Sequence, residues 1–157
     1  MFWDEERQTE WIREVYGWKE TEMEGAYKGY KSVECIMSGV HDFTGYLKRG
    51  MARSTMQASV DVRNGLLTRK EGFDLIQLHE QERPEVLDYY LKITGLSEKE
   101  FYDVMREKKL KHLKDIDLPI RPKERSNAER LVPFVEQIIQ KHLNLPDPRI
   151  TRDEESK

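Results

Sequence analysis

An adjacent histidine and aspartate, His41 and Asp42, are the residues of this sequence best suited by type to acid–base chemistry. An imidazole titrates near neutral pH, so it can donate and accept protons under physiological conditions. His41 is therefore a candidate proton donor or substrate ligand. The alternative is structural, because an aspartate at a helix start can accept hydrogen bonds from free backbone amides, with the histidine exposed beside it.

Cationic side chains are densest just after this pair, and they are candidate ligands for an anion. Lys48 and Arg53 flank a glycine, Arg53 begins a predicted helix, and Arg63 lies close to three helical turns further on. The two guanidiniums would share roughly one helix face and could hold a phosphate or carboxylate bidentately. Asp61 could hold polar groups there or orient substrate hydroxyls. The alternative is a solvated face whose local ion pairs contribute little to stability.

The segment VECIMSGVHDF, residues 33–43, has the outline of a strand followed by a phosphate-binding loop. Such a loop needs several small residues, because backbone amides must approach the anion closely. Gly39 is the one glycine here, and Val40 and His41 would crowd a ligand. We therefore expect Ser38 and Gly39 to form a turn between two helices and not a nucleotide site.

Two further groups of side chains are candidates for binding. Four aromatic residues near the same segment could stack on a base or sugar, but such residues more often fill the core of a small helical domain, which we favour. They are Tyr27, Tyr30, Phe43 and Tyr46. The four histidines are far apart and Cys35 has no partner cysteine, so we expect no metal site.

Length and composition favour one water-soluble domain. The chain has 157 residues, of which 36% are charged and 37% hydrophobic, a balance that predicts elongated helices with wide polar faces. A net charge of -3 argues against a protein that follows nucleic-acid phosphates. The N-terminus does not resemble a signal peptide, and no apolar run approaches the roughly 20 residues of a membrane span. We expect a cytoplasmic protein, and the lone Cys35 fits a reducing compartment.

Hydrophobic spacing and capping signals predict an all-α fold: a bundle of six or seven short helices, then a linker and one last amphipathic helix. Capping boxes begin at Thr68 and Ser97, and Gly17 and Gly95 are expected to end helices. The apolar residues expected to face the core include Trp11, Ile12 and Val15, then Met56 and Val60, then Phe73, Leu75 and Ile76, then Leu87, Tyr90 and Leu91, and finally Phe101, Val104 and Met105.

The pattern divides the chain into four parts. Residues 1–110 form the helical domain, and residues 111–125, which are basic and contain two prolines, are expected to be a linker. Residues 126–145 are expected to form the amphipathic helix, and residues 146–157 a disordered tail. The apolar stripe of that helix comprises Val135, Ile138, Ile139 and Leu143.

The stretch from Ala26 to Ile76 resembles the C-terminal part of the N-acetyl sugar amidotransferases, bacterial enzymes of surface-polysaccharide synthesis. The matching features are Lys31-Ser32-Val33-Glu34, Gly39-Val40-His41-Asp42, Tyr46-Leu47-Lys48, Gly50 with Ala52-Arg53-Ser54-Thr55, and Val62-Arg63-Asn64-Gly65 with Thr68-Arg69. The run ERPEVLDYYLKITGLSEKEF continues the likeness, which covers about residues 1–110, whereas residues 111–157 do not share it.

This resemblance implies an ATP-dependent reaction in lipopolysaccharide, O-antigen or related glycan synthesis. A sugar N-acetyl carbonyl is activated as an adenylate, and ammonia displaces AMP to give an acetamidino sugar. ATP with Mg²⁺ would be bound by an ATP-pyrophosphatase domain that carries a Ser-Gly-Gly-x-Asp-Ser loop, near cysteine pairs that suggest zinc. Neither feature occurs in this sequence, so we expect the helical portion alone, as a fragment, split subunit or truncated frame, without activity of its own.

The resemblance also implies roles and partners. His41 and Asp42 would be catalytic, cations would hold phosphates of the nucleotide sugar or ATP, and two carboxylates would orient substrate hydroxyls. The cations are Lys48, Arg53 and Arg63, and the carboxylates are Glu34 and Asp61. Expected partners are a nucleotide-binding domain or subunit, a glutaminase-linked ammonia supplier and a nucleotide-linked N-acetyl sugar, without nucleic acid or membrane. The alternative is a non-catalytic helical module that binds a partner or forms a homodimer through its last helix.

Overall fold

The computed structural model describes residues 4–20, 23–30 and 35–122, together with residues 137, 140–141 and 143–145. In these residues the only regular structure is helical, which confirms the predicted all-α class for the described part. The elements are α1 (Glu5–Tyr16), α2 (Ser38–Arg49), α3 (Arg53–Arg63), α4 (Arg69–Glu80), α5 (Val86–Thr94), α6 (Glu98–Glu107) and a 3₁₀ turn, η1 (Lys111–Leu113).

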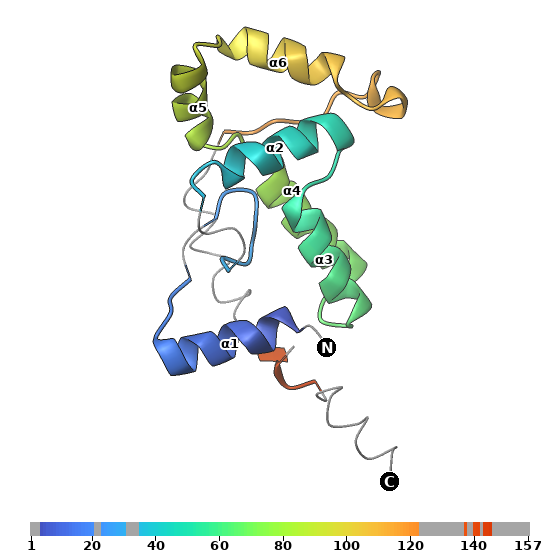
Figure 1. Ribbon diagram of the computed structural model, residues 1–157. Coiled ribbons are helices and arrows are strands. Elements are labelled where there is room, and N and C mark those ends of the chain that lie inside the picture. The colour runs from blue at the N-terminus through green and yellow to red at the C-terminus, as the bar shows by residue number, and fades with distance from the viewer. Residues whose placement is uncertain are drawn as a thin grey trace.

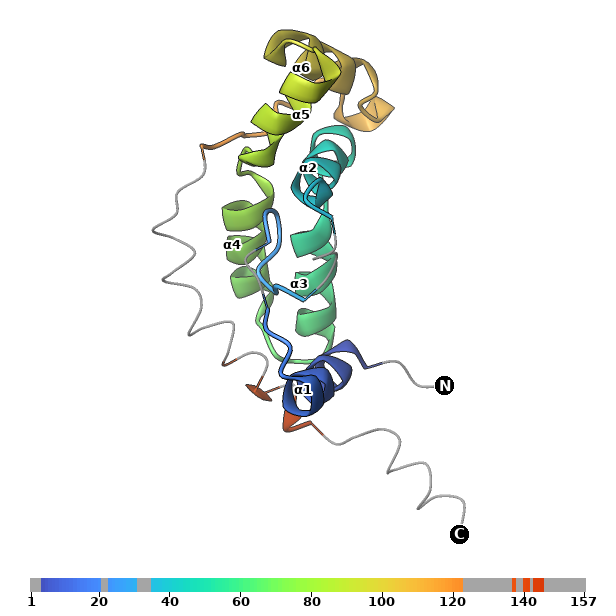
Figure 2. The same cartoon turned by 60° about the vertical axis from the view of Figure 1, so that its left-hand side comes forward.

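The helices form an elongated stack. Helices α3 and α4 lie side by side along its middle, α1 crosses the lower end, and α5 and α6 lie beyond α2 at the upper end (Figures 1 and 2). The close approach of α3 and α4 depends on Gly72, because a Cβ there would lie 3.1 Å from a methyl group of Val62. Helix α2 thus connects the α3–α4 pair to the upper end.

The helix boundaries follow the local capping signals in the sequence. Thr68 and Ser97 each accept a hydrogen bond from the backbone amide three residues on, and the glutamate there bonds back to the cap amide. Both predicted capping boxes are confirmed. The predicted helix ends at Gly17 and Gly95 are also confirmed, with φ of 65° and 73°, a left-handed conformation that glycine adopts without steric cost.

The predicted turn at Ser38 and Gly39 is wrong, because both residues lie in the first turn of α2. Gly39 is instead required by close packing. A Cβ built on it would lie 2.9 Å from the Cβ of Glu24 and 3.2 Å from a methyl group of Val86. A small residue therefore lets α2 approach both the preceding loop and the start of α5.

Two clusters of buried side chains form the core. The upper core joins α2, α5 and α6, and comprises Val40, Phe43, Tyr46, Leu47, Leu87 and Phe101. The lower core joins the loop before α2 to α3 and α4, and comprises Tyr27, Ala58, Leu66, Leu67 and Leu75. Burial of Tyr27, Phe43 and Tyr46 confirms the core interpretation for three of the four aromatic residues, and Tyr30 is half-buried.

Several apolar residues expected inside are on the surface. Met56 is 67% exposed and Phe73 51% exposed, whereas the buried face of α3 carries Ser54, Gln57, Ala58 and Asp61. In α6, Val104 is likewise exposed, beside the buried Phe101. The prediction failed for α3 because buried polar groups with hydrogen-bond partners decide which face of this helix points inward.

The segment expected to be a linker lies against the fold as far as Arg121. The Tyr46 hydroxyl donates to the Pro119 carbonyl at 2.8 Å, and the Arg121 amide donates to the Gln81 carbonyl at 2.7 Å. Leu118 packs against the upper core. The described residues do not include the expected tail or three apolar residues of the expected last helix, Val135, Ile138 and Ile139. Leu143 of that expected helix packs against the lower core.

Replacing Phe101 by Ala is expected to lower the free energy of unfolding by about 3–5 kcal/mol, because it leaves a cavity where α6 meets α2 and α5. Val104→Ala on the same helix is the matched control and should change stability by about 0.5 kcal/mol or less, since Val104 is 42% exposed. Urea unfolding of both variants measures the difference. Equal losses would contradict the described orientation of α6.

Candidate functional site

The structure brings three of the predicted site residues into contact at the junction of α2 and α3. The Nδ1 atom of His41 lies 3.2 Å from Oδ1 of Asp42. Arg53 approaches the same carboxylate from α3, with Nε 2.5 Å from Oδ2 and Nη2 3.3 Å from Oδ1. The Asp42 and Arg53 side chains are 8% and 14% exposed, whereas the His41 side chain is 77% exposed. His41 is therefore an exposed imidazole that contacts a carboxylate held in place by Arg53.

Glu80 at the end of α4 fixes the start of α3 and hence the position of Arg53. Its carboxylate accepts hydrogen bonds from the amides of Ala52 and Thr55 at 2.9 and 2.5 Å, and from the Thr55 hydroxyl at 2.8 Å. Burial raises the pKa of Glu80, although these hydrogen bonds act in the opposite direction. Sequence reasoning missed this residue, since its partners lie 25 or more positions away.

The hollow at this junction is too small for a substrate. It has a volume of about 10 Å³ and is lined by Asp42, His79 and Glu80 among others, which leaves room for about one water molecule. The cluster of His41, Asp42 and Arg53 is therefore a surface feature. It can transfer a proton only to a molecule that lies over the exposed imidazole.

Asp61 belongs to a different, enclosed network in the lower half of the molecule. Its Oδ1 accepts from the Lys28 ammonium at 2.8 Å and its Oδ2 from the Tyr27 hydroxyl at 2.6 Å. Lys28 also pairs with Glu6 of α1, which accepts from the Tyr30 hydroxyl at 2.9 Å. Because Asp61 is 0% exposed, its carboxylate is directed to these protein groups.

Burial and neighbouring carboxylates shift the pKa values in this network upwards. Burial raises the pKa of Tyr27, with Asp61 adding to the effect, and the pKa of Tyr30, with Glu6 adding to it. For Lys28, burial acts to lower the pKa, but the charges of Glu6 and Asp61 outweigh it, and the pKa is raised. All three groups therefore keep their protons more tightly in the folded protein than in the unfolded chain.

The other predicted ligands lie apart from this cluster. Arg63 is exposed at the far end of α3, where Nη1 donates to the Ser59 hydroxyl at 2.6 Å. A helical rise of about 1.5 Å per residue places it roughly 15 Å from Arg53 along the axis, so one phosphate cannot contact both. Lys48 is half-buried near the C-terminal end of α2, and Glu34 is outside the described residues.

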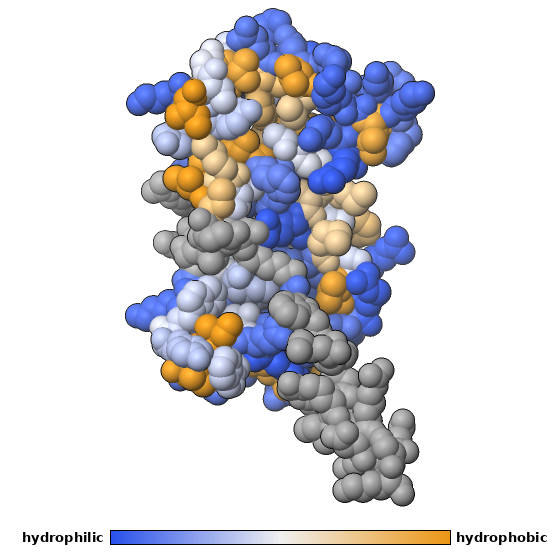
Figure 3. Space-filling view, viewed as in Figure 1, coloured by the Kyte–Doolittle hydropathy of each residue, from blue (hydrophilic) through white to orange (hydrophobic). Residues whose placement is uncertain are grey.

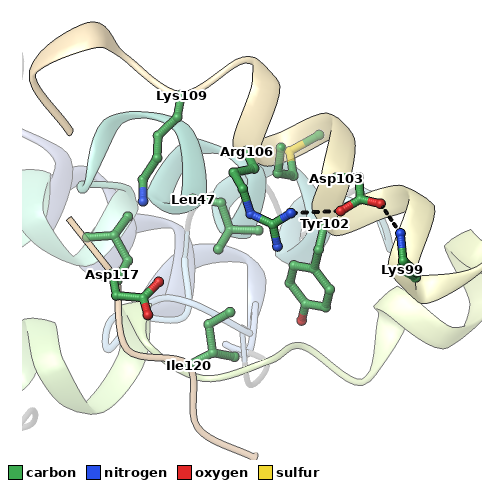
Figure 4. Close-up of a pocket in the computed structure, with 10 residues that line it drawn as sticks. Leu47, Lys99, Tyr102, Asp103, Arg106, Lys109, Asp117 and Ile120 are labelled. Carbon is green, nitrogen blue, oxygen red and sulfur yellow. Dashed lines mark hydrogen bonds and ion pairs between the residues drawn. The ribbon is translucent and has the colours of Figure 1, made fainter. Parts of the chain in front are cut away.

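A larger hollow of about 330 Å³ lies between α2, α6 and the segment that follows η1. Figure 4 shows Tyr102, Arg106 and Lys109 projecting from α6 and the residues just after it, and Asp117 and Ile120 from the segment opposite. Two of the cations that line it are paired, since Asp103 contacts both Arg106 and Lys99, at 2.7 and 2.6 Å. None of the predicted site residues lines this hollow.

The described residues show neither a metal-binding cluster nor a membrane-spanning helix. No group of three or more His, Cys, Asp or Glu side chains in this part of the chain is placed to hold a metal ion. None of the helices described is both long and apolar enough to pass through a membrane.

Comparison with known proteins identifies the described domain. A family model described as "LPS biosynthesis protein WbpG-like, C-terminal domain" matches residues 24–120, more than half of the chain. The match includes His41, Asp42 and Arg53, whereas α1 precedes it. No curated protein and no solved structure matches the chain significantly.

Asp61→Ala is expected to lower the free energy of unfolding by about 3–5 kcal/mol, because it removes one partner from a buried ion-pair network. Asp74→Ala is the matched control, since Asp74 forms an exposed pair with Lys70 within one helix, and should cost about 0.5 kcal/mol or less. Chemical denaturation compares the two variants. A small effect at Asp61 would show that its carboxylate is available for another role.

Stability is expected to fall as the pH rises above about 10. The unfolded chain releases the protons of Tyr27, Lys28 and Tyr30 near their ordinary pKa values of 10.0 to 10.5, whereas the folded protein retains them. Because the unfolded state then binds fewer protons, alkali favours unfolding. Urea midpoints between pH 9 and 11 measure the slope, which Tyr27→Phe should reduce. A slope unchanged in that variant would contradict the assignment.

Proposed function

The chain belongs to the WbpG-like family of lipopolysaccharide biosynthesis proteins, and on this premise we propose that it is the helical part of an ATP-dependent N-acetyl sugar amidotransferase. The reaction would convert a sugar acetamido group into an acetamidino group with ammonia, during synthesis of O-antigen or a related glycan. The observation that carries the proposal is the family match over residues 24–120, which contains the whole cluster of His41, Asp42 and Arg53. The motif resemblance to sugar amidotransferases supports the chemistry.

The work of this reaction would be divided between this chain and its partners. A nucleotide-binding domain or subunit would hold ATP with Mg²⁺, which would convert the carbonyl oxygen into an adenylate with release of pyrophosphate, so that AMP could leave in the next step. Ammonia would come from a glutaminase-linked partner, and the substrate would be a nucleotide-linked N-acetyl sugar. We propose a cytoplasmic reaction, because its substrates would be ATP and a nucleotide-linked sugar.

His41 is the residue we propose to move a proton. When ammonia attacks the activated carbon, a C–N bond forms and the nitrogen must lose a proton before AMP leaves. The contact between Nδ1 of His41 and Asp42 favours the tautomer that carries its proton on Nδ1. The Nε2 lone pair is then available to accept a proton from the attacking nitrogen.

Asp42 and Arg53 would act through His41. The Asp42 carboxylate orients the imidazole, and Arg53 holds the carboxylate in place. Arg53 is therefore proposed as a positioning residue in place of a phosphate ligand. Lys48 and Arg63 remain proposed contacts to the phosphates of the nucleotide sugar or ATP, at separate points.

Of the two carboxylates expected to orient substrate hydroxyls, one keeps that proposed role and the other does not. Glu34 remains a proposed substrate contact, and it lies outside the described residues. Asp61 is enclosed with Lys28 and Tyr27, so it would contribute to the site only by stabilising the fold.

His41→Ala is expected to lower kcat for acetamidino-sugar formation by about 10²–10⁴-fold, the usual contribution of a general base. The assay combines the chain with its nucleotide-binding partner, ATP, Mg²⁺, ammonium and the N-acetyl nucleotide sugar, with product detected by mass spectrometry. KM for the sugar and the urea midpoint should change little, because the His41 side chain is 77% exposed.

His112→Ala is the matched control, since His112 is exposed in η1, which lies near the C-terminal end of α2, whereas His41 is in the first turn of that helix. Arg53→Lys should lower kcat, because a lysine cannot hold the Asp42 carboxylate through two nitrogen atoms as Arg53 does. Full turnover in the His41→Ala variant would remove the catalytic role, and the chain would then be better described as a non-catalytic helical module.

A further inference from the structure

Cationic side chains gather where the last turn of α2 meets the segment after α6. The Leu110 amide donates to the Lys48 carbonyl at 3.0 Å, and a Cβ on Gly50 would lie 3.4 Å from a methyl group of Leu113. These contacts hold η1 against the end of α2, at the upper right of Figure 1. We define the basic end as Lys48, Arg49, Lys108, Lys109, Lys111 and Lys114.

Neighbouring anions balance only part of this charge. The carboxylates in the same segment are Glu107, Asp115 and Asp117, and Glu107 pairs with Lys108 at 2.6 Å. Lys111 and Lys114 are exposed and form no ion pair within the described residues. Six cations thus stand beside three anions, although the whole chain has a net charge of -3.

Helix dipoles explain some of these cations and not others. Lys48 and Arg49 occupy the last turn of α2, where the negative end of the helix dipole favours positive charge. This effect is confined to the last turn, whereas Lys111 and Lys114 come four and seven residues after α6 ends at Glu107. The charge of these two lysines therefore remains available to a partner.

Aliphatic side chains protrude among the lysines. Leu110 and Ile116 are 42% and 49% exposed. Figure 3, in the same view as Figure 1, shows apolar atoms surrounded by hydrophilic side chains at this end of the molecule. Lysines around aliphatic side chains match the two layers of a charged lipid surface, which are anionic headgroups and the hydrocarbon beneath them.

The composition of the basic end favours a lipid surface over a macromolecule. Protein interfaces are enriched in aromatic residues and arginine and depleted in lysine, whereas five of these six cations are lysines. Single-stranded nucleic acids stack their bases on aromatic rings, but Leu110 and Ile116 are aliphatic. A lysine suits the headgroup region, because its ammonium can reach phosphates while its methylene groups stay in apolar surroundings.

The opposite end of the molecule has the opposite charge. Helix α1, which crosses the lower end, carries four glutamates and two arginines. An anionic surface would therefore repel this end and attract the other one. The charge distribution thus favours a single orientation, with the basic end towards the surface.

We propose that the basic end docks the protein on a membrane surface that contains anionic phospholipids. Lys111 and Lys114 contact the phosphates, and Leu110 and Ile116 insert between the headgroups. The docking is peripheral, since none of the described helices could span a bilayer. It is independent of the proposed function. It also replaces the sequence-based expectation of no membrane partner, because net charge does not reveal cations that the fold collects from α2 and from the segment after α6.

The test measures sedimentation of the full chain with lipid vesicles. Mixed vesicles of phosphatidylcholine and phosphatidylglycerol should bind the chain at low salt and release it at high salt, whereas vesicles of phosphatidylcholine alone should not bind it. Lys111→Ala combined with Lys114→Ala should weaken binding by about tenfold or more, because each lysine near an anionic surface contributes to affinity. Lys70→Ala combined with Lys92→Ala is the matched control, since it removes two exposed lysines outside the basic end.

Ile116→Ser separates a lipid surface from free phosphate. It should weaken vesicle binding, because the aliphatic side chain would enter the headgroup region, whereas a free anion would not be affected by it. Failure to bind the mixed vesicles, equal binding to phosphatidylcholine, or an unchanged affinity in the Lys111 and Lys114 variant would overturn the proposal. So would release of the chain by millimolar inorganic pyrophosphate together with no effect of Ile116→Ser, since the basic end would then be a site for free phosphate.

Discussion

The arrangement of the lower half of the molecule depends on one buried cation. Lys28 lies between Glu6 of α1 and Asp61 of α3, and charges removed from water in this way must be paired. This requirement turns the Asp61 side of α3 inward and leaves Met56 outside. It also brings the charged side of α1 against the fold. The lower half is therefore organised by complementary charges, and its apolar cluster fills the space beside them.

The same principle applies at the junction of α2, α3 and α4. Asp42 and Glu80 are buried carboxylates, and each holds a different part of the first turn of α3: Asp42 pairs with the Arg53 side chain and Glu80 accepts from the backbone amides. The exposed His41 is attached to this rigid frame. The upper end, in contrast, is held by aromatic and aliphatic packing between α2, α5 and α6. Ion pairs and hydrogen bonds thus position the side chains in the part of the molecule where the candidate chemistry lies.

How far the sequence predicts this structure depends on the distance between interacting residues. The caps at Thr68 and Ser97 were predictable because each involves a partner three residues away. The inward face of α3 was not, because the Lys28 that selects it lies 33 positions from Asp61. In the site, adjacency revealed His41 and Asp42, but the contact of Arg53 with Asp42 and the role of Glu80 follow from the tertiary fold. The one sequence signal for the role of Lys28 was its position between two glycines in the loop before α2.

The backbone contact at Arg121 has a consequence for how the upper end opens. The Arg121 amide donates to the Gln81 carbonyl, and its carbonyl accepts from the Arg83 amide, both at 2.7 Å. The chain between these points, which contains α5 and α6, is thereby closed into a loop. Fluctuations that release α6 must also break this closure or the packing of Leu118, so we infer that the loop opens as one cooperative unit. Its amide protons would then exchange with solvent at a common rate, separate from those of α3 and α4.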